Sequence, residues 1–206
     1  MPARQNWFDG WRLFALLSLT LLALSIWIAS MRAFEVEGVR MVIRFTARTS
    51  LVLFCLAFAG AALARLWPNA WTRWLRRNRR YLGVSFAASH AIHAAAILAF
   101  AVMDPAGYAA ATSIASYIFG GIGYAFIIAM TATSFDRPAQ AMGPRAWRTL
   151  HLAGGYYLLF QFMVSFGKRI PDMPLYALFL IPLVAVFVLR MVSMAVKAAP
   201  RPAQAG

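Results

Sequence analysis

Three histidines are the residues of this chain best suited to chemistry, and each lies within or at the start of an apolar run. His90 and His93 are three residues apart in the run that follows Arg79 and Arg80, and His151 begins another run. An ionisable side chain is costly to place in a bilayer and therefore usually marks a functional site. Neutral imidazole is also the commonest metal-ligating side chain. The histidines therefore predict a metal centre between membrane helices.

Haem b is the metal centre that fits two histidines on separate helices. Histidines on neighbouring parallel helices can face each other across a bundle core, which is where bundles hold cofactors. The sequence predicts one haem, with His93 and His151 as axial ligands to its iron. His90 lies on about the same helix face as His93 and is the alternative ligand. The competing interpretation is that each histidine only hydrogen-bonds a neighbouring helix.

Four further residues would complete a haem site. Arg148 precedes His151 by three residues and Arg48 lies one turn inside an apolar run, so each could contact a haem propionate or a quinone oxygen. The alternative for both arginines is a head group that reaches the membrane interface. Gly154 and Gly155 follow His151 by one turn and would leave room for the porphyrin edge. Small residues in membrane helices, however, more often serve helix packing.

The two predicted ligands lie at different depths along their helices. His93 lies 13 residues after Arg80, about 20 Å along a helix, whereas His151 lies three residues after Arg148, about 5 Å. Ligands of one iron must lie at similar depth. His90 would reduce the difference by about 4.5 Å. This count favours His90, and the ligand on this helix stays open between the two histidines.

The composition requires that these residues be positioned by membrane helices. The chain has 206 residues, of which 62% are hydrophobic and 13% charged, and its mean hydropathy is +0.67. The net charge of +14 comes from arginines between apolar runs, which indicates a membrane surface and no nucleic-acid partner. No G-x-G-x-x-G nucleotide-binding motif is present. Electrons would therefore arrive from a partner protein carrying flavin, or from a quinone.

Six apolar runs are long enough to cross a bilayer. They are residues 11–31, 45–66, 81–103, 112–133, 146–166 and 175–194. The first run is too long for a cleaved signal peptide. These runs predict a single all-α transmembrane domain, a six-helix bundle covering residues 1–206. Residues 32–44 are predicted to be a charged loop, residues 67–80 an interfacial loop rich in Arg and Trp, and residues 197–206 a disordered tail.

The distribution of basic residues predicts the orientation of the bundle. Six spans place both termini on one side, and most of the 20 basic residues fall on that side. Since basic residues concentrate in cytoplasmic segments, both termini are predicted to be cytoplasmic. The expected location is the bacterial inner membrane.

Four short motifs occur in an order and spacing that are shared with a known family. They are Arg79-Arg80-x-Leu82-Gly83 with His93 ten residues later, Thr46-Ala47-Arg48-Thr49-Ser50-Leu51, Thr131-Ala132-Thr133-Ser134, and Met142-Gly143 followed by Trp147 and Leu150-His151. Over about residues 40–190 the chain resembles the ferric-reductase-like transmembrane domain family. The closest branch is MsrQ, the haem-binding membrane subunits of the bacterial methionine sulfoxide reductase system.

This resemblance implies a b-type haem held by His93 and His151, and electron transfer from a cytoplasmic flavin or quinone donor to a partner reductase or a metal ion. The chain departs from the family at Val164, 13 residues after His151, where family members usually have a second histidine. Two-haem members of the superfamily also have a second histidine 13 residues after the one that corresponds to His93, and here that position is Ala106. The resemblance therefore implies one haem at most. The alternative function is a haem-free membrane scaffold or assembly partner with the same fold.

Overall fold

A computed structural model describes residues 7–198, and this part of the chain is helical without any strand. The elements are α1 (Gly10–Ser30), α2 (Val36–Leu66), α3 (Ala70–Met103), α4 (Pro105–Ala111), α5 (Ile114–Ala132), α6 (Asp136–Met142), α7 (Pro144–Gly167), the 3-10 turn η1 (Pro174–Tyr176) and α8 (Ala177–Ala198). Every predicted apolar run lies within one of the long helices or within two residues of it.

Five elements are long and apolar enough to cross a membrane: α1, α2, α3, α5 and the segment Pro174–Ala198 that contains η1 and α8. The chain is therefore an all-α, membrane-embedded protein. The helix α7 has 24 residues but is less apolar, because it includes His151, Tyr156, Tyr157 and Gln161.

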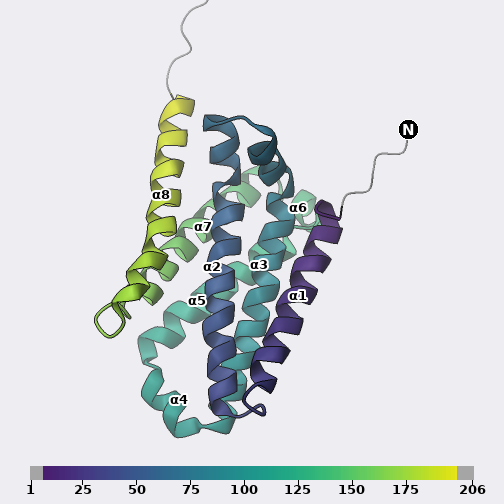
Figure 1. Ribbon diagram of the computed structural model, residues 1–206. Coiled ribbons are helices and arrows are strands. Elements are labelled where there is room, and N and C mark those ends of the chain that lie inside the picture. Colours follow the sequence, from purple (N-terminus) through teal and green to yellow (C-terminus); the bar gives the residue numbers. More distant parts are fainter. Residues whose placement is uncertain (1–6, 199–206) are drawn as a thin grey trace, which may run out of the picture.

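The long helices run side by side (Figure 1). The most extensive pairing joins α2 to α3, and α1 packs on this pair. The helix α5 packs on α7, and α8 contacts both α2 and α7. The start of α1, the start of α3 and the end of α8 all lie at one end of the bundle (Figure 1). Two cofactor-sized cavities lie between α3, α5 and α7, and one of them extends to α2 and α8.

Two segments that were predicted to be loops are helical, and the loop predictions were wrong. The charged segment 32–44 is helical from Val36, and the segment 67–80 forms the first turns of α3 from Ala70. The start of α3 is a capping box: Thr72 N–H donates to Asn69 Oδ1 at 2.9 Å, and Asn69 N–H donates to Thr72 Oγ1 at 3.0 Å. Arginine is a good helix former, so charged residues extend these helices beyond the apolar run.

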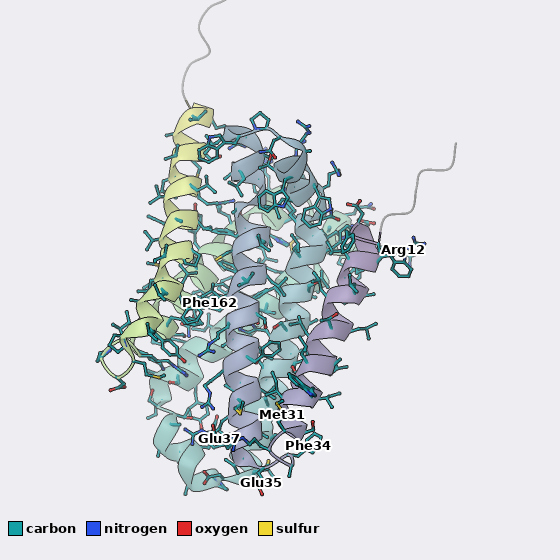
Figure 2. The ribbon with its side chains drawn as sticks, viewed as in Figure 1. Arg12, Met31, Phe34, Glu35, Glu37 and Phe162 are labelled. Carbon is teal, nitrogen blue, oxygen red and sulfur yellow. The ribbon has the colours of Figure 1, made fainter. Side chains whose placement is uncertain are left out.

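The predicted disordered tail is only partly covered. Residues 197 and 198 are the last residues of α8, and residues 199–206 lie outside the described part of the chain. Figure 2 shows Phe162 in the bundle interior, and Glu35 and Glu37 at the opposite end from Arg12. Phe162 belongs to the main hydrophobic core, which joins α1, α2, α3, α5, α7 and α8.

Candidate functional site

The predicted site residues line two separate cavities. The first, the histidine cavity, has a volume of about 520 Å³ and is lined among others by His90, His93, Tyr124, Val164 and Lys168. It lies between α3, α5 and α7, with Ala47 contributing from α2.

The second, the arginine cavity, has a volume of about 490 Å³ and is lined among others by Arg79, Arg80, Arg148, His151 and Arg190. Ile127 of α5 and Leu158 of α7 line both cavities. Their side chains are only 6% and 3% exposed. These two residues therefore form part of the wall between the cavities.

The hydrogen bonds of His93 define which of its ring nitrogens is free. Nδ1 lies 3.1 Å from the Ile43 carbonyl oxygen and 2.9 Å from Thr46 Oγ1. The carbonyl can only accept, and the Thr46 hydroxyl donates to the Val42 carbonyl at 2.7 Å. Nδ1 must therefore carry the proton, which leaves Nε2 as an acceptor. A metal-ligating histidine has this arrangement, because its second nitrogen usually donates to a carbonyl or carboxylate.

A buried polar network holds α2 against α3 at the depth of His93. Ser50 Oγ donates to Ser89 Oγ at 2.9 Å, and Ser89 Oγ contacts the Thr46 carbonyl at 3.4 Å. Thr46, Ser50 and Ser89 are fully buried. Small hydroxylated side chains allow two membrane helices to approach closely while their polar atoms remain bonded. This network fixes the position of the His93 backbone relative to its partners on α2.

His90 lies beside His93 in the same cavity. Its ring centroid is 4.8 Å from that of Phe86, 5.4 Å from His93 and 5.7 Å from Tyr124. Its Nδ1 atom is buried without a hydrogen-bond partner. Because both histidines project from one face of α3, a flat cofactor bound to His93 could not take His90 on its other side without intersecting the helix. His90 is therefore a neighbour of such a cofactor, or an alternative to His93, but not the second ligand.

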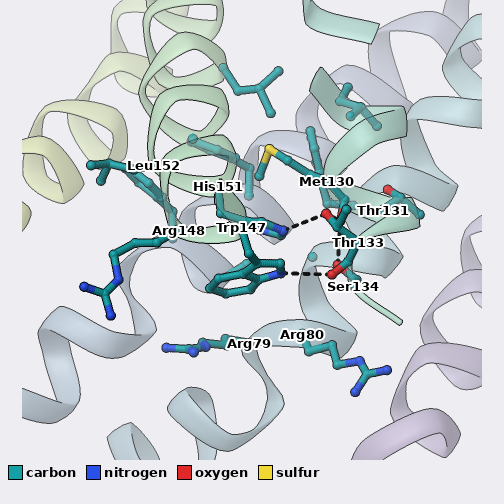
Figure 3. Close-up of a pocket in the computed structure, with 18 of the residues that line it drawn as sticks. Arg79, Arg80, Met130, Thr131, Thr133, Ser134, Trp147, Arg148, His151 and Leu152 are labelled. Carbon is teal, nitrogen blue, oxygen red and sulfur yellow. Dashed lines mark hydrogen bonds between the residues drawn. The ribbon is translucent and has the colours of Figure 1, made fainter. Parts of the chain in front are cut away.

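His151 is bonded in a different way. Its Nε2 lies 3.1 Å from Thr133 Oγ1, and that hydroxyl donates to the Ala129 carbonyl at 2.7 Å, so the histidine must donate through Nε2 (Figure 3). The ring stacks on Trp147 with centroids 4.2 Å apart, and Trp147 Nε1 donates to the Thr133 carbonyl at 2.9 Å. These contacts tie α7 to the end of α5. The remaining acceptor, Nδ1, is the nitrogen next to the main chain.

The structure does not bring His93 and His151 into one cavity. Val164, 13 residues after His151, lines the histidine cavity with His93. Arg80, 13 residues before His93, lines the arginine cavity with His151. The two histidines are thus offset along the bundle in the direction that the count of helical residues indicated.

The two predicted site arginines also lie in different places. Arg148 lines the arginine cavity. Arg48 lines neither cavity; its guanidinium group lies 5.5 Å from the ring centroid of Phe179 and 5.9 Å from that of Tyr176. It therefore lies against aromatic rings of η1 and α8.

Gly154 and Gly155 allow neighbouring side chains to approach α7. A Cβ atom at Gly154 would collide with Met130 and Phe126 of α5, and one at Gly155 would lie 2.5 Å from Phe58 of α2. Gly155 also lines the arginine cavity. Open space adjoins a different glycine: Gly120 lines the histidine cavity and has no heavy atom within 4 Å of its Cβ position.

Two functional candidates were not predicted as site residues. Ile43 acts through its carbonyl group, which leaves no sequence signal. Arg190 lies inside the last apolar run and lines the arginine cavity. Its position among apolar residues is a signal that the sequence contains.

Comparisons of the chain with family models, with curated proteins and with solved structures find no match. Among residues 7–198, no three His, Cys, Asp or Glu side chains are grouped to hold a metal ion. The class defined by the fold is an all-α membrane protein with a histidine-lined cavity between α3, α5 and α7.

Proposed function

We propose that this protein is a membrane electron-transfer protein that holds one b-type haem through His93, in the histidine cavity. The observation that carries the proposal is the hydrogen bond of His93 Nδ1 to the Ile43 carbonyl at 3.1 Å. It leaves Nε2 as a lone-pair donor in a cavity of about 520 Å³. Cofactor cavities typically measure about 300–1,000 Å³.

The residues around the cavity suit a flat, largely apolar cofactor with acidic groups. Phe119, Tyr124, Phe162 and Phe166 provide aromatic walls, and Lys168 provides a cation for a propionate. Gly120 leaves open space beside its main chain. His93 would be the only histidine on the iron, because no histidine of α5 or α7 lines this cavity.

A bound haem supplies an iron centre that gains and loses single electrons. The chain's own residues set the conditions for that exchange. The Ile43 carbonyl and the Thr46 hydroxyl hold the His93 ring in one orientation and raise its basicity as a ligand. The apolar lining keeps water away from the cofactor, and burial of this kind is one of the means by which proteins adjust a redox potential.

Electrons would pass from a cytoplasmic flavin or quinone donor to a partner reductase or a metal ion. The most specific form of this proposal has a methionine sulfoxide reductase as the electron acceptor, because the motifs that resemble MsrQ surround the histidines. Thr46 contacts His93, and Thr133 and Trp147 contact His151.

The proposed topology has six spans, with α7 as the sixth, and both termini in the cytoplasm of a bacterial inner membrane. It is supported by the shared position of the start of α1 and the end of α8 (Figure 1). The arginine-rich start of α3 lies at that same end, as the positive-inside rule requires of a cytoplasmic face.

The test is the haem content of detergent-purified protein, measured by the pyridine haemochrome method with reduced-minus-oxidised spectra. About one b-type haem per chain is expected, with loss in His93→Gly and retention in the matched variant His90→Gly. Added imidazole should restore binding to His93→Gly, which a purely structural histidine would not allow. No haem in protein expressed with ample haem supply would refute the proposal.

The haem-free scaffold is the second candidate function. It is favoured by one observation: His93 and His151 both already have hydrogen-bond partners within the protein. The same spectra separate the two candidates, because a scaffold would show no haem absorption.

A further inference from the structure

Arg190 is a partly buried cation that has no ion-pair partner among residues 7–198. It lies within α8, in a segment apolar enough to cross a membrane. Its guanidinium group stacks 4.2 Å above Phe58, and one nitrogen donates to the Phe58 carbonyl at 3.4 Å. Its Nε atom is buried without a hydrogen-bond partner. Arginine in a membrane helix usually pairs with an opposite charge or faces a polar cavity.

Three further arginines line the same cavity. Arg80 donates to Asp136 at 2.8 Å, but its Nε atom is also buried without a partner. Arg79 and Arg148 form no ion pair with any residue between 7 and 198. Four arginines and one carboxylate therefore line one cavity. Arg80 and Arg190 are partly buried and Arg79 and Arg148 are exposed, so the cavity has an excess of positive charge that favours an anionic ligand.

The remainder of the arginine cavity is apolar. Its walls include Phe54, Phe58, Phe86, Ile127 and Leu158. Figure 3 shows Arg79, Arg80 and Arg148 along one edge of the cavity, with His151, Trp147 and Met130 beside them. A ligand that fits both parts has a compact anionic group and an apolar body.

From these observations we infer that the arginine cavity binds a phosphate-bearing ligand, with the phosphate oxygens accepting hydrogen bonds from the guanidinium groups of the cavity. Phosphate has several acceptor oxygens and suits the planar fork of arginine. This inference is independent of the haem proposal, which concerns the other cavity. The phosphate could belong to an anionic phospholipid of the bilayer or to a ligand from water, and the experiment distinguishes these sources.

In the first arm, delipidated full-length protein in detergent is titrated with phosphatidylglycerol or phosphatidylcholine and followed by native mass spectrometry. In the second arm, inorganic phosphate is added and thermal unfolding is recorded. Both arms compare wild type with Arg190→Gln, Arg190→Lys and Arg148→Gln. The control is Arg77→Gln, which removes an exposed arginine of α3 that does not line the cavity.

We expect one phosphatidylglycerol per chain, bound at least about tenfold more weakly by Arg190→Gln, with Arg77→Gln behaving like wild type. Arg148 is exposed, so Arg148→Gln keeps the test valid if Arg190→Gln fails to fold. If inorganic phosphate raises the unfolding temperature of wild type but not of the cavity variants, and no lipid binds selectively, the site is assigned to a ligand from water. Equal binding of both probes by wild type and the cavity variants, or no binding by wild type, would overturn the inference.

Discussion

The histidine cavity and the arginine cavity are similar in volume and share a wall, but their polar groups are organised differently. At the histidine cavity, His93 is held by partners on α2, and the buried hydroxyls nearby are bonded to one another. At the arginine cavity, Arg80 and Arg190 each keep a buried nitrogen without a partner. The first cavity therefore presents the oriented ring of His93 beside the unpartnered Nδ1 of His90, and the second presents positive charge.

The two histidines also differ in which ring nitrogen donates a hydrogen bond. His93 has its cavity-side nitrogen free because the nitrogen nearer the main chain is the one that donates. His151 donates through Nε2 to Thr133 and stacks on Trp147, so it connects α7 to α5. A histidine at the start of an apolar run is thus a ligand candidate only if its outer nitrogen is not already used.

The largest expected effect comes from adding a ligand to the histidine cavity. Val164 lies on the α7 wall of that cavity, so Val164→His should supply a second axial nitrogen. The wild-type haem, with one histidine on the iron, should be high-spin and bind carbon monoxide when reduced. The variant should be low-spin and bind it poorly, as judged by absorption and electron paramagnetic resonance spectra.

Val164→Leu is the control, and its spectrum should match that of wild type. A low-spin spectrum in the wild type would show that another group of the cavity, such as Tyr124 or Lys168, already completes the coordination.

The next effect tests how His93 is held. Thr46→Val removes the hydroxyl 2.9 Å from His93 Nδ1 while it keeps the side-chain shape. Loss of such a supporting contact typically weakens metal binding about 10–100-fold, so haem should dissociate faster by a similar factor. Thr49→Val is the matched control, because Thr49 contacts Ser89 and not His93. Equal haem retention in the two variants would contradict the role of Thr46.

A smaller effect separates a packing glycine from a cavity glycine. Gly155→Ala places a methyl group against Phe58, which cannot easily move because Phe54, Tyr156 and Arg190 surround its ring. Gly120→Ala meets open space.

Both changes gain the same helix propensity, so the comparison isolates the packing cost. Gly155→Ala should be less stable than Gly120→Ala by about 1–3 kcal/mol, measured by unfolding in mixed detergent. Equal stabilities would show that Phe58 moves aside at little cost.

The smallest effect concerns Arg48. Because Arg48 lines neither cavity and lies against Phe179 and Tyr176, Arg48→Gln should leave haem content and spectra unchanged. Loss of haem in this variant would instead place Arg48 on a propionate.

Much of the fold could be predicted from hydrophobic runs alone. The long helices follow those runs, but their outer ends do not. Charged residues such as Arg40 and Arg76 were interpreted as loops, although charged side chains are compatible with helix and α2 and α3 extend through them. A run of apolar residues marks where a helix is buried in lipid, and not where it ends.

The site was predictable in part. The sequence predicted all three histidines as site residues, and each lines one of the two cavities. The count of helical residues indicated a difference in depth between His93 and His151 but did not decide whether they share an iron. The pairing of these two histidines came from the resemblance, and the structure places them in different cavities. Tautomers depend on partners such as the Ile43 carbonyl, and no sequence pattern specifies those.

The most direct test of this account compares His93→Ala with His151→Ala, measured as haem per chain alongside wild type. Loss of haem in His93→Ala with near-complete retention in His151→Ala is the predicted result. Loss in both variants would contradict it and would indicate that the two histidines share one iron. Loss only in His151→Ala would also contradict it, because the haem would then lie in the arginine cavity.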